Sequence, residues 1–143
     1  MTKHLNTSLR IQGVFLLAVL SMFSILSIPT ASAATGVERE WVEKKYNIKG
    51  QWDIVQQGDQ TVIRFSDNFK TKNGPDLKIF LSKQTIAEVN GRNATQDSVL
   101  LGTLKSPRGG QEYILPAGID VNDFQTVLIH CEKYSVLWGG GTI

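Results

Sequence analysis

Cysteine is almost absent from this sequence, and that scarcity limits both how the fold is held together and what it can bind. The 143 residues include one cysteine, Cys131. A disulfide within the chain is therefore excluded, so packing must stabilise the fold. The Gly-x-Ser-x-Gly and His-Glu-x-x-His motifs of two hydrolase classes are missing too. These absences disfavour a stand-alone enzyme but leave the question of catalysis open.

Long apolar runs are also missing, except near the N-terminus. Lys3 and Arg10 precede an apolar stretch over residues 14–28, and Ala31-Ser32-Ala33 supplies the small residues that signal peptidase requires. Residues 1–33 are therefore predicted to be an export signal that is cleaved after Ala33. The stretch is shorter than the roughly 20 residues of a membrane span, although a retained anchor stays an alternative. We expect an extracytoplasmic location, periplasmic or secreted, with no stable membrane span after cleavage.

Removal of this leader changes the charge and the supply of metal ligands. The leader holds Lys3 and Arg10 and no acid, which accounts for the formal net charge of +2. The remaining basic and acidic residues are interleaved, so no basic stretch favours nucleic-acid binding. His4 is also lost, which leaves His130 and Cys131 as the remaining histidine and cysteine. A zinc site with four such ligands or a copper site with two histidines cannot be built from them, and no metal site is predicted.

Downstream of Gly50 the sequence predicts short strands separated by turns. Apolar side chains alternate with polar ones or form short runs at residues 52–54, 61–65, 77–81, 99–101, 113–115, 127–129 and 135–138. Turn residues arrive every 8–12 positions. One such turn, Gln57-Gly58-Asp59-Gln60, lies between two of these strands and predicts a hairpin. We expect a single all-β domain over residues 46–143, an antiparallel β-sandwich or barrel-like fold. The charged residues 34–45 would form a linker or a short helix, with Trp41 docking it.

Six sequence pieces in register resemble the DM-thirteen domain family, also called the electron-transfer DM-thirteen family. They are Gly50-x-Trp52, Phe65-Ser66-Asp67-x-Phe69-Lys70, Gly74-Pro75-Asp76-Leu77, Leu101-Gly102-x-Leu104-Lys105-Ser106, Gly110-Gln111-x-Tyr113-x-Leu115-Pro116, and Val127-x-Ile129-His130-Cys131 with Val136-x-Trp138-Gly139. The resemblance implies a small all-β extracytoplasmic domain that serves redox or electron-transfer reactions, in some proteins beside haem-binding domains and membrane cytochromes. The characteristic cysteine of the family corresponds to Cys131. A tryptophan often precedes it in the family, whereas this chain has His130.

Strand alternation constrains what Cys131 can do. It places Val127, Ile129 and Cys131 on one face of a strand, and Leu128 and His130 on the other. A Cys–His nucleophilic pair within the strand is therefore disfavoured, and a thiol facing the core would be inert packing. At the strand end, Lys133 could instead lower the pKa of the thiol. The products open to one cysteine are a sulfenic acid, a mixed disulfide or a disulfide-linked homodimer.

Two functions compete. The first is an exported redox module, in which Cys131 exchanges electrons or thiols with a separate redox or membrane protein. Haem is possible as a cofactor but is not required by the sequence, and His130 and Tyr134 are candidate cofactor-binding residues. For His130, a solvated ring is the favoured interpretation over a ligand. The second function is a non-catalytic extracytoplasmic domain that binds a ligand or a protein at its loops, with Cys131 as core packing.

Overall fold

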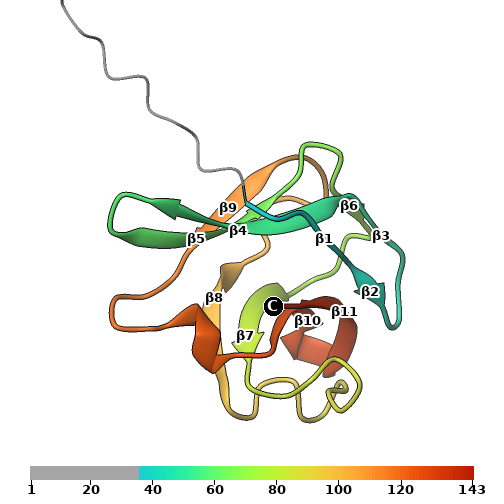
Figure 1. Ribbon diagram of the computed structural model, residues 1–143. Coiled ribbons are helices and arrows are strands. Elements are labelled where there is room, and N and C mark those ends of the chain that lie inside the picture. The colour runs from blue at the N-terminus through green and yellow to red at the C-terminus, as the bar shows by residue number, and fades with distance from the viewer. Residues whose placement is uncertain (1–35) are drawn as a thin grey trace, which may run out of the picture. The chain divides into compact units, whose positions relative to one another are not determined.

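A computed structural model describes residues 36–143 as a two-layer antiparallel β fold (Figure 1). The predicted signal peptide and its cleavage site lie outside the described residues. Two 3-10 turns are present, η1 (Val121–Asp123) and η2 (Glu132–Tyr134), and residues 36–143 contain no α-helix. The strands are β1 (Arg39–Glu40), β2 (Val42–Glu43), β3 (Ile48–Lys49), β4 (Gln51–Gln57), β5 (Gln60–Phe65), β6 (Lys70–Thr71), β7 (Leu77–Ser82), β8 (Ser98–Thr103), β9 (Gln111–Ile114), β10 (Thr126–Cys131) and β11 (Val136–Thr142).

The strands form two larger sheets and one short ribbon. The first sheet has the order β1-β4-β5-β9, the second has the order β2-β11-β10-β7-β8, and β3 pairs with β6. The expected hairpin at Gln57–Gln60 is confirmed, because β4 and β5 pair on either side of Gly58 and Asp59. Gly58 has a φ of 60°, a left-handed conformation that glycine adopts at little cost. The expected all-β sandwich is thus confirmed.

The main core lies between the two larger sheets. Alternation along β7 and β10 directs Leu77, Ile79 and Leu81, together with Val127, Ile129 and Cys131, into this core. From the first sheet come Trp52, Ile63, Phe65 and Tyr113. The period-two pattern of these strands therefore predicted the inward faces correctly. Burial of these apolar side chains supplies the main stabilisation in a domain without a disulfide.

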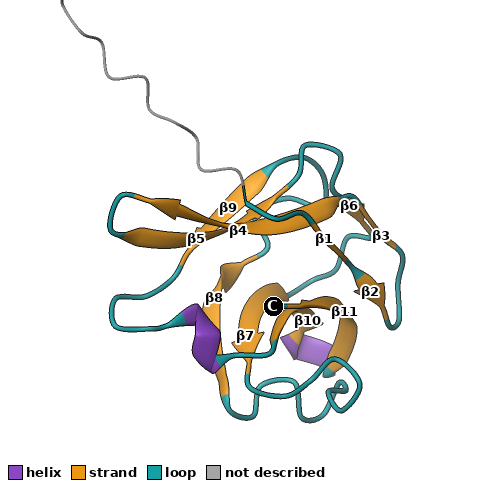
Figure 2. Ribbon diagram, viewed as in Figure 1, coloured by secondary structure: helices purple, strands orange, loops and turns teal. Residues whose placement is uncertain are grey.

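A second apolar cluster covers the opposite face of the second sheet. Phe80, Leu128 and Leu137 project from the strands, and Val89 and Ala94 of the segment 83–97 pack over them. Figure 2 shows this segment as irregular loop below β7 and β10. As a result all six residues of β10 are buried. Ser82 at the end of β7 is also buried, with 0% exposure, and its hydroxyl oxygen accepts a hydrogen bond from the Gln84 amide.

Residues 36–45 do not form the alternative short helix. They contain β1, which pairs with β4, and β2, which pairs with β11, so the segment contributes an edge strand to each of the two larger sheets. Trp41 lies between these two strands and docks as expected, with 8% exposure. Its ring contacts those of Trp52 and Phe65 at centroid distances of 5.7 and 4.9 Å. The described part of the chain contains no helix that is long and apolar enough to cross a membrane.

Candidate functional site

Cys131 is the last residue of β10 and is sealed inside the main core. It lies opposite Leu77 of β7 and Val136 of β11, and its exposure is 0%. Among the described residues the sulfur takes part in no hydrogen bond. The neighbouring Lys133 does not place its positive charge beside the sulfur, because its Nζ lies over the exposed Tyr134 ring, 5.5 Å from the centroid. In this conformation the thiol is packed as a small apolar side chain.

The turn that follows Cys131 is exposed and held by a few polar contacts. Residues 132–135 are exposed, and Ser135 adopts a left-handed φ of 51°. The Glu132 amide donates to the carbonyl of Asp76 over 3.1 Å. The Glu132 carboxylate also pairs with Lys78, whose Nζ lies 3.6 Å from Asp76 Oδ1. The hydrogen bond to Glu132 raises the pKa of Lys78. The sealed sulfur is therefore one residue away from a turn that is tied to β7 mainly through Glu132.

His130 is buried, so the solvated ring favoured by the sequence was wrong. Its exposure is 2%, because the loop 83–97 covers its face of β10. Nε2 lies 2.9 Å from the carbonyl oxygen of Gly91. Since that oxygen only accepts, Nε2 is the donor of this hydrogen bond. Nδ1 has no partner among the described residues. His130 thus fastens the loop to β10 and lies on the other side of the strand from the thiol.

Tyr134, the other candidate cofactor ligand, is in a different environment. Its side chain is 62% exposed on the turn η2. His130 is buried below the loop and Cys131 faces the core, so the structure does not bring the three predicted site residues together. A haem could not reach the sulfur of Cys131 in this conformation, because no part of that residue is exposed. The described residues also contain no group of three His, Cys, Asp or Glu side chains that could hold a metal ion.

A shallow groove of about 530 Å³ lies beside the turn. Lys44 and Lys45 line it together with residues 87–91 and 135–137. Val136, which pairs with Cys131 across β10 and β11, is among these lining residues. The groove therefore reaches the cross-strand neighbour of Cys131.

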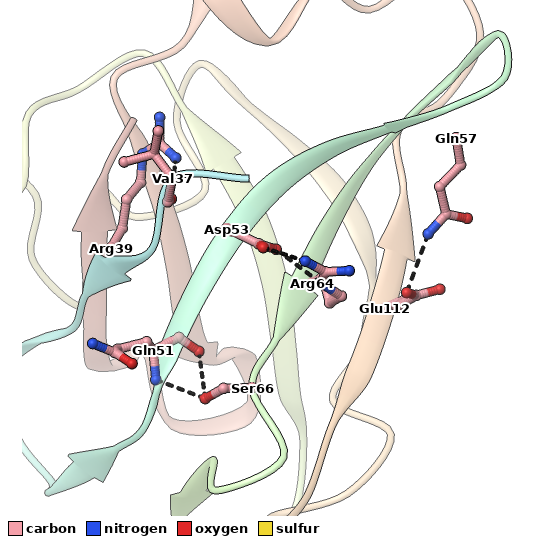
Figure 3. A network of polar contacts seen from close by, with 8 residues as sticks. All are labelled: Val37, Arg39, Gln51, Asp53, Gln57, Arg64, Ser66 and Glu112. Atoms are coloured by element: carbon pink, nitrogen blue, oxygen red, sulfur yellow. Dashed lines mark hydrogen bonds and ion pairs between the residues drawn. The ribbon is translucent and has the colours of Figure 1, made fainter. Parts of the chain in front are cut away.

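The outer surface of the first sheet carries a polar network that the sequence did not reveal (Figure 3). Arg64 Nε donates to Asp53 Oδ1 over 3.1 Å, and Arg64 Nη2 donates to Asp53 Oδ2 over 2.5 Å. Asp53 is 6% exposed, and its hydrogen bond raises the pKa of Arg64. A hollow of about 80 Å³ adjoins the pair and is also lined by Gln51 and Ser66. Such a bidentate pair adds a geometrically specific contact between β4 and β5.

An aromatic cluster fills the core between the two sheets. Phe65 contacts Trp41, Phe69 and Tyr113 with centroid distances between 4.8 and 5.3 Å. Tyr113 donates its hydroxyl proton to Gln111 Oε1 over 2.7 Å. Burial raises the pKa of Tyr113 to about 12. The cluster is stabilising packing, and Tyr113 stays protonated over the physiological range.

The fold and the site together define a class: a small antiparallel β-sandwich with one sealed thiol at a strand end. A family model described as Electron transfer DM13 matches residues 40–141. This match covers most of the sequence, so the chain belongs to the electron transfer DM13 family, which the six sequence pieces between Gly50 and Gly139 already resembled. The match begins within the segment that was expected to be a linker. No curated protein and no solved structure matches the chain.

Proposed function

We propose that this chain is an exported domain that serves electron transfer with a separate redox partner, and that the thiol of Cys131 is its redox group. Membership of the electron transfer DM13 family is the observation that carries the proposal. The predicted leader, residues 1–33, supports a periplasmic or secreted location, where thiols and disulfides can interconvert. The position of Cys131 beside an exposed turn supports its choice as the reacting residue.

The sealed sulfur requires a local opening before it reacts. The thiolate is the reactive form, and it must meet its partner directly. Opening the turn would break the contacts of Glu132 with Asp76 and Lys78, while most of the β10–β7 pairing stays in place. Such local openings cost less free energy than global unfolding. The conformation described above is therefore the protected, resting form of the thiol.

The reaction that fits one cysteine is exchange with a disulfide of the partner. The Cys131 thiol loses its proton, the thiolate attacks one sulfur of the partner disulfide, and that S–S bond breaks as a mixed disulfide forms. The leaving partner sulfur departs as a thiolate and takes up a proton. Cys131 and the attacked sulfur then share the new bond, so the partner supplies the oxidant and no metal or haem is required.

A labelling experiment tests the proposal. The protein purified from the extracytoplasmic fraction is treated with a maleimide, and the rate of Cys131 modification is measured as urea is raised below the unfolding transition. Local opening predicts modification that depends weakly on urea and runs faster than global unfolding allows. Glu132→Gln should accelerate it several-fold, because the contact with Lys78 is weakened. Glu112→Gln, an exposed carboxylate elsewhere, is the matched control.

A second candidate function is non-catalytic binding at the surface, with Cys131 as packing. The complete burial of Cys131 in the apolar cluster favours it. It predicts that maleimide modifies Cys131 only through global unfolding, with the urea dependence of the full transition. It also predicts that Glu132→Gln changes modification only as far as it changes overall stability.

A further inference from the structure

Three exposed cations lie in a row across neighbouring backbone segments at one end of the sandwich. Lys49 of β3 is directly opposite Lys70 of β6, and Lys70 forms an isolated bridge with Arg108 on its other side. Two hydrogen bonds flank the bridge, from the Thr71 amide to the Pro107 carbonyl and from the Gly109 amide to the Phe69 carbonyl, both 2.9 Å long. Figure 1 shows β3 and β6 side by side. We call Lys49, Lys70 and Arg108 the cation row.

The three side chains share one surface. Residues directly opposite each other in an antiparallel pair project to the same side. Ile48 and Thr71, the adjacent residues in β3 and β6, are buried, whereas Lys49, Lys70 and Arg108 are exposed. Opposite residues have Cα atoms about 4.5–5.5 Å apart. The cation row therefore presents three positive charges to solvent over a span of about 10 Å.

No acid within the described residues neutralises the cation row. The ion pairs of residues 36–143 involve Arg64 with Asp53 and Lys78 with Asp76 and Glu132, and none involves Lys49, Lys70 or Arg108. Asp67 lies in the neighbouring turn beside Gly110 but forms no ion pair with the row. Like charges that face each other across strands are destabilising. The strand pairing therefore keeps three like charges close together, which lowers the stability of the fold.

Protection of an exposed edge does not account for this arrangement. Lysine on an edge strand deters pairing with other chains, but Lys70 lies on β6, which already pairs with β3 and is bridged to Arg108 on its other side. Here the three charges face one another across neighbouring backbone segments. Charges placed at staggered positions on these segments would deter pairing with other chains equally well, without repelling one another. An anionic partner would relieve the repulsion when it binds.

We infer that the cation row is a docking surface for a carboxylate-rich segment of a partner protein. Glutamates three or four residues apart on a helix lie about 5–6 Å from one another, which matches the spacing of the row. A row whose backbone positions are fixed by strand pairing suits such a segment better than a bilayer surface, which attracts clusters of basic residues through its charge. The inference does not depend on the role of Cys131.

The direct test measures binding of the purified full chain to a synthetic helical peptide with glutamate at every third or fourth position. Binding is expected at low salt and is expected to weaken strongly as ionic strength rises, because exposed charges are screened. Lys70→Gln should weaken peptide binding by roughly three- to five-fold at low salt. Lys83→Gln removes one charge at the end of β7, outside the row, and should change binding by less than about two-fold.

A stability measurement separates loss of binding from damage to the fold. Lys70→Gln should raise the melting temperature by about 1–4 °C, because it removes the central repulsion. The same variant therefore gains stability and loses affinity, a combination that misfolding cannot produce. Equal weakening by Lys70→Gln and Lys83→Gln would overturn the inference, as would binding to anionic phosphatidylglycerol vesicles without binding to the peptide. Either result leaves the maleimide test of Cys131 unaffected.

Discussion

Replacement of Cys131 by alanine and by serine tests whether its surroundings are apolar. The residue has 0% exposure, and its sulfur is roughly equivalent to one buried methylene, worth about 1 kcal/mol of transfer free energy. The cavity left by Cys131→Ala adds about 0.5 kcal/mol at about 24 cal/mol per Å³. Cys131→Ala should therefore lower the free energy of unfolding by about 1.5–2 kcal/mol.

Cys131→Ser should be the worse of the two. Serine restores most of the volume but buries a hydroxyl, and an unpaired buried hydroxyl costs about 1–3 kcal/mol. β10 is paired on both sides, with β7 and β11, so its main-chain acceptors are already used. The total loss should reach about 2–4 kcal/mol.

Urea unfolding followed by circular dichroism measures both variants. With an m-value of about 1.5 kcal/mol per M, the midpoint should fall by about 1 M for alanine and by more for serine. A serine variant as stable as the alanine variant would refute the reasoning, because it would mean that a polar partner or water lies beside the sulfur.

Three further predictions follow from other parts of the molecule. Arg64→Leu leaves the buried Asp53 carboxylate unpaired and should lower the free energy of unfolding by about 2–3 kcal/mol. The loss is smaller than for a fully buried pair because the Arg64 side chain is 35% exposed. Adding Asp53→Asn should recover part of the loss in urea unfolding, and no recovery would argue against the pair. Burial raises the pKa of Tyr113 above the ordinary tyrosine value to about 12, so its stabilising contribution is complete below pH 10 and should be lost as pH rises toward about 12. Tyr113→Phe should not show this loss of stability at high pH. Absorbance at 295 nm should show one of the three tyrosines titrating near pH 12 in the native protein but not in the unfolded protein. Gly91→Ala would place a Cβ 2.0 Å from the Ser135 carbonyl oxygen and should disturb the hydrogen bond from His130 Nε2 to the Gly91 carbonyl. Amide hydrogen exchange in residues 83–97 should then accelerate. Unchanged exchange would show that this hydrogen bond does not hold the loop on β10.

The parts of the fold that the sequence predicted are those with local signals. Alternation in β7 and β10 and the turn at Gly58 depend on residues close together in the chain, so both strands and the hairpin were predicted. The side of β10 occupied by Cys131 followed from the same period. The edge strands β1 and β2 have two residues each. Strands this short carry no periodic signal, and their partners lie far away in the sequence.

The parts that were missed depend on contacts between distant segments. His130 was expected in solvent because the irregular segment 83–97 gave no sign that it would cover the second sheet. The cation row was hidden because Lys49, Lys70 and Arg108 are separated by acids along the chain, and the β3–β6 pairing and its bridge gather them. The pair of Asp53 and Arg64 also depends on strand register, which the hairpin sets but composition does not show.

The most direct test of the proposed redox role is the urea dependence of Cys131 modification by maleimide in the folded protein. Opening of the turn predicts a rate with a shallow urea dependence, higher than the rate set by global unfolding and increased by Glu132→Gln. A rate that follows the global unfolding equilibrium at every urea concentration, with no change in Glu132→Gln beyond its effect on stability, would contradict the proposal. Cys131 would then be a packing residue.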